Sequence, residues 1–194
     1  MMVPACAIGV WLGLKLGLGS ELRVLASRAP GAWETVRKGT FSGTPVGLAI
    51  GAVALLGVSS MPENARIPGF ENPTILEGLL RCLSAALTEE IAFRFGLMTL
   101  SAWVVWLGLK RTATHATLLW VGNLLASLVF AAARLPGQPP EAWSPAVLGP
   151  LLTFNAAAGL TMGWLFMRYG LMSAISAHFA ADVVQVVGMA ALVG

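Results

Sequence analysis

Six long runs of apolar residues, separated by short polar stretches, divide the chain. They extend over about residues 3–19, 43–60, 75–109, 113–133, 145–167 and 171–193. Because about 20 apolar residues in helical form cross the hydrocarbon core of a bilayer, the pattern predicts about six membrane-crossing helices. The third run is too long for one upright crossing, and Glu77 and Arg81 near its start favour an interfacial helix that leads into the membrane. We therefore expect an all-α fold, a polytopic transmembrane helix bundle.

Glycines four residues apart recur within these runs. They occur at Gly13 and Gly17, at Gly47 and Gly51, and at Gly159 and Gly163. Small residues at this spacing let two helices approach closely in a membrane. We therefore interpret these glycines as helix-packing positions and not as ligands.

The composition also indicates a membrane protein. Of the 194 residues, 57% are hydrophobic and 11% are charged, whereas an ordinary soluble domain carries about 25% charged residues. The length suits one helix bundle, so we expect a single integral membrane domain over residues 1–194. The net charge of +3 is small, and we expect no nucleic-acid partner.

The basic residues predict the orientation of the bundle. They gather after the first, third and fifth apolar runs, at Arg23, Arg28, Arg37, Lys38, Lys110, Arg111 and Arg168. Loops rich in lysine and arginine stay in the cytoplasm. The proline-rich loops around residues 62–73 and 136–145 are poorer in basic residues, so we expect them on the opposite side, together with both termini.

Two carboxylates and a guanidinium interrupt the third apolar run, in Glu89-Glu90-Ile91-Ala92-Phe93-Arg94. Ionisable groups at membrane depth are costly and usually functional. Glu90 and Arg94 are four residues apart, so they share a helix face and can neutralise each other. Glu89 is rotated away from that face by about 100°. We therefore expect Glu90 to be paired and Glu89 to be free for chemistry.

The last apolar run contains a second polar pair, His178 and Asp182, also four residues apart. On a soluble helix such a pair is usually a structural hydrogen bond, but a buried aspartate in a membrane must find partners. Together with Glu89, the pair supplies a base, a polarising imidazole and a group that orients it, which is typical of a hydrolytic site. No serine or cysteine lies in a nucleophile motif, and no HExxH zinc motif occurs.

At these residues the chain resembles the CPBP family of intramembrane proteases, which contains the Rce1-type CAAX prenyl endopeptidases and the bacterial Abi proteins. The family carries an EExxxR motif, an FxxxH motif on the next helix and an Hxxx(N/D) motif on a later one. Here Glu89 to Arg94 matches the first motif and His178 to Asp182 the third. The resemblance spans about residues 89–184, within a family-like core of about residues 75–194.

The second motif departs from the family pattern. If Phe130 is the phenylalanine of the FxxxH motif, the histidine position four residues later is occupied by Arg134. The resemblance implies that the first glutamate and that histidine activate a water molecule, and that His178 and Asp182 stabilise the oxyanion. Arginine stays protonated and cannot accept a proton, but it can hold Glu89 in place or stabilise an oxyanion. His115 cannot replace the missing histidine, because it lies 19 residues earlier on the same run, about 28 Å away along a helix.

Three interpretations follow. In the first, the protein is an active endopeptidase in which glutamate-activated water cleaves peptide bonds near the C-terminus of membrane-anchored or lipidated proteins. In the second, it is a catalytically silent relative that acts as a membrane binding or immunity-type protein, with Arg134 as the lesion. In the third, Glu89, His178 and Asp182 hold a metal ion, against which the positive charge of Arg134 argues.

We favour the first interpretation, with no cofactor and with the lipid bilayer as the environment. Its candidate catalytic residues are Glu89, Glu90, Arg94, Arg134, His178 and Asp182. The resemblance implies an integral protein of a prokaryotic inner membrane. The loop charges place Glu89 and Arg134 nearer the non-cytoplasmic side, whereas Rce1-type enzymes are expected to open to the cytosol.

Overall fold

The computed structural model describes residues 30–59, 75–109, 113–137 and 143–193, together with part of the N-terminal segment between residues 7 and 18. This part of the chain is helical and contains no strand. Its long helices are α3 (Ala32–Ser59), α4 (Ile75–Glu90), α5 (Thr99–Gly108), α6 (His115–Ala132), α7 (Pro145–Tyr169) and α8 (Leu171–Val193). Two short elements join them: the π-helix η2 (Ile91–Met98) and the 3-10 turn η3 (Leu135–Gly137).

Five helices are long and apolar enough to cross a membrane. They are Ala32–Ser59, Ile75–Gly108, His115–Ala132, Pro145–Tyr169 and Leu171–Met189. The prediction of an all-α polytopic bundle is therefore confirmed, and the protein is an integral membrane protein. The expected first crossing, at residues 3–19, falls largely outside the described residues.

The second and third predicted runs have different limits in the structure. Helix α3 begins at Ala32 and not near residue 43, because its polar first turns are stabilised by Glu34, which binds Arg37 at 2.7 Å. The expected interfacial helix before Glu89 is not a separate element. Instead α4, η2 and α5 form one helix of 34 residues, Ile75–Gly108, about 50 Å long at 1.5 Å per residue.

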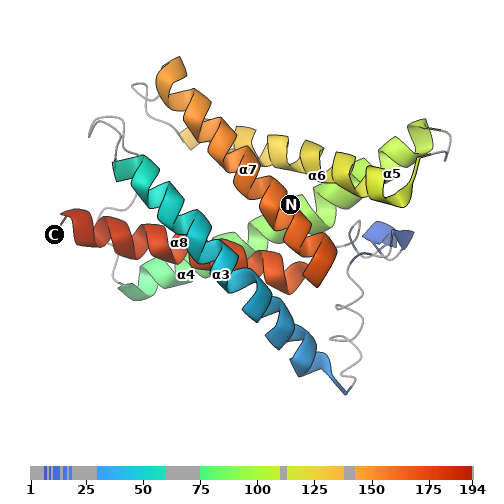
Figure 1. Ribbon diagram of the computed structural model, residues 1–194, viewed down its shortest axis with the longest axis horizontal. Coiled ribbons are helices and arrows are strands. Elements are labelled where there is room, and N and C mark those ends of the chain that lie inside the picture. Colours follow the sequence, from blue (N-terminus) through green and yellow to red (C-terminus); the bar gives the residue numbers. More distant parts are fainter. Residues whose placement is uncertain are drawn as a thin grey trace.

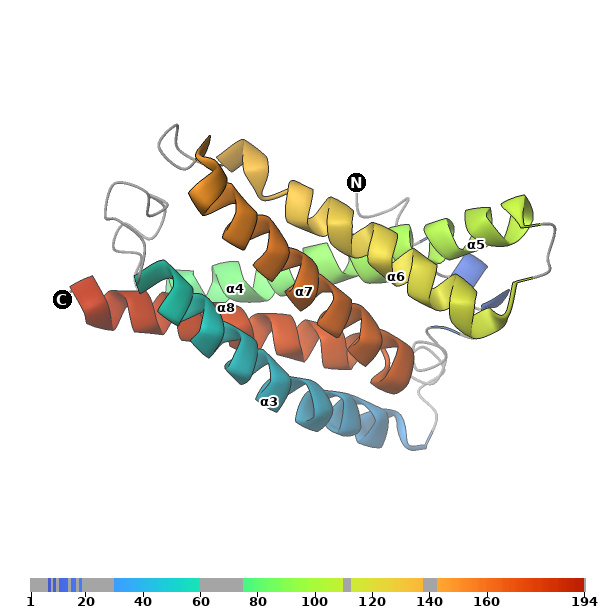
Figure 2. The same ribbon diagram turned by 45° about the horizontal axis from the view of Figure 1, so that its top comes forward.

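Successive long spans run in opposite directions, with α4 and α5 counted as one span (Figure 2). The end of α3, the start of α4, the end of α6, the start of α7 and the end of α8 lie at the left of Figure 2. The opposite end holds the start of α3 with Arg37 and Lys38, and the end of α7 with Arg168. The basic residues of these helices thus gather at one end of the bundle.

Glycines bring α3 directly against α8, across which it lies in Figure 1. Gly43, Gly47 and Gly51 are buried at every fourth position of α3. A Cβ atom at Gly47 would collide with the backbone carbonyl oxygen of Ala177, the residue before His178. The interpretation of the glycines as packing positions is confirmed here and at Gly163 of α7, where a Cβ would collide with Asn123 of α6.

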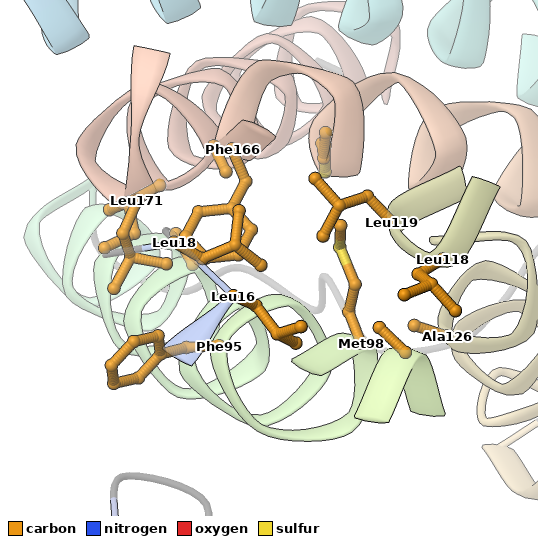
Figure 3. Packing of buried hydrophobic residues seen from close by; sticks show 14 residues of the cluster. Leu16, Leu18, Phe95, Met98, Leu118, Leu119, Ala126, Phe166 and Leu171 are labelled. Atoms are coloured by element: carbon orange, nitrogen blue, oxygen red, sulfur yellow. The ribbon is translucent and has the colours of Figure 1, made fainter. Parts of the chain in front are cut away.

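An apolar core fills the bundle near the starts of α6 and α8 (Figure 3). Phe95 and Met98 of η2, Leu118 of α6, Phe166 of α7 and Leu171 of α8 contribute buried side chains to it. This packing closes the end that holds Arg168. Space for a cavity remains in the other half of the bundle, where the polar residues of α4 and α8 lie.

The contact between α3 and α8 predicts a strong effect of a single methyl group. We expect Gly47→Ala to lower the free energy of unfolding by about 1–3 kcal/mol. The added carbon would collide with backbone atoms of Ala177, so one of the two helices would have to shift to make room for it. Gly57→Ala on the same helix is the matched control, since a Cβ there meets no atom within 4 Å. Thermal unfolding in detergent compares the two, and equal midpoints would contradict the contact.

Candidate active site

The six candidate residues come from three segments that are distant in the sequence. Glu89 and Glu90 end α4, and Arg94 lies in the π-helix that follows. Arg134 comes just after α6, beyond its capping residue Ala133. His178 and Asp182 lie in α8. The structure brings all six together.

Glu90 is the buried centre of this cluster. One oxygen, Oε2, accepts a hydrogen bond from Arg94 Nε at 3.0 Å, as the four-residue spacing predicts. The other, Oε1, lies 2.8 Å from His178 Nδ1. The side chains of Glu90 and Arg94 are 0% exposed and that of His178 is 3% exposed. Because a carboxylate only accepts hydrogen bonds, Nδ1 of His178 carries the proton in this contact.

Glu90, and not Asp182, therefore orients the imidazole of His178. The sequence spacing had predicted that Asp182 would do so. In the structure Asp182 Oδ2 lies 3.6 Å from His178 Nε2, too far for a hydrogen bond. Glu89 Oε2 is 3.7 Å from the same nitrogen. Since Glu90 holds Nδ1, the imidazole turns Nε2 toward two carboxylates that are 24% and 27% exposed.

Arg134 binds Glu89 through two parallel hydrogen bonds. Its Nη1 donates to Oε1 at 3.2 Å, and its Nη2 donates to Oε2 over a shorter distance. This two-pronged geometry suits a guanidinium and a carboxylate and orders both. Arg134 thus holds Glu89 in place, which is one of the two roles expected of it. Glu89 is not free, as its position on the helix alone suggests, because a residue 45 positions later supplies its counter-ion.

Phe130 is a site residue that the sequence analysis did not select. The guanidinium carbon of Arg134 lies 4.7 Å from its ring centroid, and that of Arg94 lies 4.9 Å away. Its ring also meets His178 edge-on at 6.0 Å. Among the described residues, Nη1 and Nη2 of Arg94 have no hydrogen-bond partner, so this ring supplies their electrostatic contact. The spacing of four residues between Phe130 and Arg134 is the sequence signal that could have identified it.

The α-helix changes to a π-helix immediately after the two glutamates. Residues Ile91–Met98 form a π-helix, and Thr99 is its C-terminal capping residue. The Thr99 hydroxyl lies 2.6 Å from Phe95 O and 2.9 Å from Gly96 O, and so it caps carbonyl groups at the end of the wide turns. π-Helical turns are rare and are frequent at functional sites. Here they follow Glu90 directly and contain Arg94.

A cavity of about 550 Å³ adjoins the cluster. Arg134, His178 and Asp182 line it, and Glu89 contacts two of these residues directly. Most other lining residues are apolar and come from α3, α4, α7 and α8, including Val53, Cys82, Ala85, Leu151, Phe154 and Val186. They lie in the half of the bundle opposite the core of Figure 3. The cavity thus joins an apolar peptide-sized space to the charged cluster.

No group of three or more histidine, cysteine, aspartate or glutamate residues in the described ranges is arranged to hold a metal ion. His115 lies outside the cluster, at the start of α6, with Nε2 2.7 Å from the carbonyl oxygen of Leu16.

One comparison with known proteins gives a match. A family model described as type II CAAX prenyl endopeptidase Rce1-like matches residues 71–184. The matched segment is more than half of the 194-residue chain and includes all six candidate residues. No curated protein and no solved structure matches the chain.

The buried ion pair predicts different roles for the two adjacent glutamates. We expect Glu90→Gln to destabilise the protein by about 3–5 kcal/mol, because it leaves the charge of Arg94 buried without a counter-ion. Glu89→Gln is the matched control, since Arg134 is 35% exposed and loses less when its partner becomes neutral. Thermal unfolding in detergent measures both, and equal losses would contradict the central role of Glu90.

Proposed function

The chain belongs to the type II CAAX prenyl endopeptidase Rce1-like family, and from this premise we propose that Glu89 activates the water molecule that cleaves the substrate. Family membership makes the protein a CAAX-type intramembrane protease and implies a membrane-anchored, prenylated protein as its class of substrate. The convergence of Glu89, Arg134 and His178 beside the cavity carries the proposal. The bond cleaved lies near the C-terminus of that substrate.

The proposed reaction begins with a proton transfer to Glu89. As the oxygen of the water attacks the scissile carbonyl carbon, the carboxylate of Glu89 takes up one of its protons. The carbonyl oxygen becomes the oxyanion of a tetrahedral intermediate. The C–N bond then breaks and Glu89 returns its proton to the departing nitrogen, which becomes the new amine. The second proton of the water stays on the new carboxyl group, which then releases it to solvent.

Arg134 fits this reaction as an electrostatic group. In the resting site its charge balances that of Glu89 through two hydrogen bonds. When Glu89 becomes neutral by protonation, the guanidinium loses its counter-ion at the moment when the oxyanion forms. The positive charge then stabilises the oxyanion. An arginine is compatible with catalysis at this position because it replaces proton transfer with charge compensation.

His178 supplies a second stabilising group. The charges of three carboxylates (Glu89, Glu90 and Asp182) exceed those of two guanidiniums (Arg94 and Arg134) by one. One additional proton makes the cluster neutral, which a low-dielectric site favours. When that proton is on His178, Nε2 becomes a donor that faces Glu89 and Asp182, where it stabilises the oxyanion.

We propose that the reaction needs no cofactor. The guanidinium of Arg134 already holds both oxygens of Glu89. A metal ion bound to Glu89 would have to displace the guanidinium of Arg134 or be repelled by its positive charge. The residues of the cluster and one water molecule supply every step above.

The substrate enters from the end of the bundle that holds the starts of α4 and α7 (Figure 2). The cavity is lined by the last turns of α3 and the first turns of α4 and α7. Arg37, Lys38 and Arg168 lie at the other end, which the positive-inside rule assigns to the cytoplasm. We therefore propose a prokaryotic inner-membrane protease that acts from the non-cytoplasmic side on C-terminal anchors.

Replacement of Glu89 tests the base. We expect Glu89→Gln to abolish cleavage of peptides that carry a lipidated cysteine near their C-terminus, because an amide does not accept the proton from water. Purified wild type and variant are compared in vesicles by mass spectrometry of the products. A variant that unfolds at the wild-type temperature and still cleaves would show that Glu89 is not the base.

Replacement of Arg134 tests charge compensation. We expect Arg134→Lys to retain part of the activity and Arg134→Ala to lose at least about 100-fold in kcat, the size of effect that follows loss of one oxyanion donor. Arg134→His, measured on the same peptides, distinguishes charge compensation by an arginine from proton transfer by a histidine. Unchanged activity in Arg134→Ala, or activity that appears only in Arg134→His, would contradict the proposed role.

A further inference from the structure

Arg81 is a charged side chain of the cavity that the reaction above does not use. It lies on α4 and lines the cavity together with Gly78, Cys82 and Ala85 of the same helix. The structure gives Arg81 no ion pair and no hydrogen bond within the described part of the chain. Arg134, the other arginine of the cavity lining, is already bound to Glu89.

We propose that Arg81 binds the terminal carboxylate of the substrate peptide, an assignment that rests on the proposed endopeptidase function. A carboxylate that enters a largely apolar cavity loses much of its hydration and needs a cationic partner. Arg81 supplies a planar guanidinium that matches a carboxylate with two parallel hydrogen bonds. The charge of the cavity beyond the catalytic cluster thus complements a free C-terminus.

The spacing along α4 supports this assignment. Arg81 precedes Glu89 by eight residues, which corresponds to about 12 Å along the helix axis. A C-a-a-X substrate has three residues after its modified cysteine, and three extended residues span about 10–11 Å. A peptide whose scissile bond lies at Glu89, directly after that cysteine, therefore presents its carboxylate at Arg81.

The lining between these two positions suits the residues of such a peptide. Cys82 and Ala85, which lie between Arg81 and Glu89 on α4, are small and line the cavity, as does Ala181 of α8. They leave room for apolar side chains and offer them an apolar surface. The cavity thus has one end at Arg134 and His178, which contact Glu89, an apolar middle and a cationic end with Arg81.

The test compares one lipidated peptide that ends in a free carboxylate with the same peptide that ends in an amide. We expect wild type to prefer the acid by about tenfold or more in kcat/KM, the contribution of a hydrogen bond to a charged group. Arg81→Ala should bring the ratio of acid to amide close to one, and Arg81→Lys should give an intermediate ratio. Arg168→Ala is the matched control, because Arg168 contacts Tyr169 at the opposite end of α7, and it should keep the wild-type ratio.

A binding measurement separates this inference from the proposed function. In the Glu89→Gln background, anisotropy of fluorescent acid and amide peptides gives two dissociation constants, with and without Arg81→Ala. A preference for the acid that disappears in Arg81→Ala supports carboxylate binding, even if the wild type cleaves neither peptide and the proposed function fails. A preference that persists in Arg81→Ala overturns the inference. So does an effect of Arg81→Ala that appears only in vesicles of anionic lipid, because Arg81 then binds a lipid phosphate.

Discussion

The arrangement of the site depends on the two contacts that the carboxylate of Glu90 makes. This carboxylate is fully buried, and its two oxygens bind Arg94 of η2 and His178 of α8. A buried charge is tolerable only when it is paired and hydrogen-bonded. Arg94 lies on the same long helix as Glu90, so a rotation of that helix or a sliding of α8 would break the bond to His178 and leave Oε1 of Glu90 buried without its partner. The pairing therefore sets the register between the two helices.

The packing around this contact holds the same register by other means. Gly47 places the backbone of α3 against the carbonyl of Ala177, next to His178. Phe130 of α6 lies against the guanidiniums of Arg94 and Arg134. The helices that carry the polar residues are thus supported by backbone contact on one side and by a ring on the other. Close packing of this kind replaces the hydrophobic driving force, which is weak between helices in lipid.

Arg134 determines the charge balance of the outer carboxylate of the cluster. A cation at this position makes the outer carboxylate, Glu89, part of an ion pair. The inner pair, Glu90 and Arg94, has the same composition but is fully buried. The site therefore contains two ion pairs with different exposure, on either side of His178. The inner pair positions the imidazole, and the outer pair is partly exposed beside the cavity.

The sequence by itself determined the elements and much of the polar set. Apolar runs identified the membrane helices, because their length and composition are local properties. The spacing of four residues paired Glu90 with Arg94, because both partners share one helix face. It also placed His178 and Asp182 close together. The start of α3 at Ala32 was missed, because its first turns are polar and held by a local ion pair.

Only the tertiary structure decided which of these charged groups bind each other. The bond from Glu90 to His178 joins residues 88 positions apart, and the bond from Arg134 to Glu89 joins residues 45 apart. Helical periodicity says nothing about either, because each depends on how two helices are rotated against each other. The π-helix of η2 and the ring of Phe130 between two guanidiniums are likewise products of packing. The sequence determined which charged groups lie at membrane depth, and the packing of α4, α6 and α8 determined their partners.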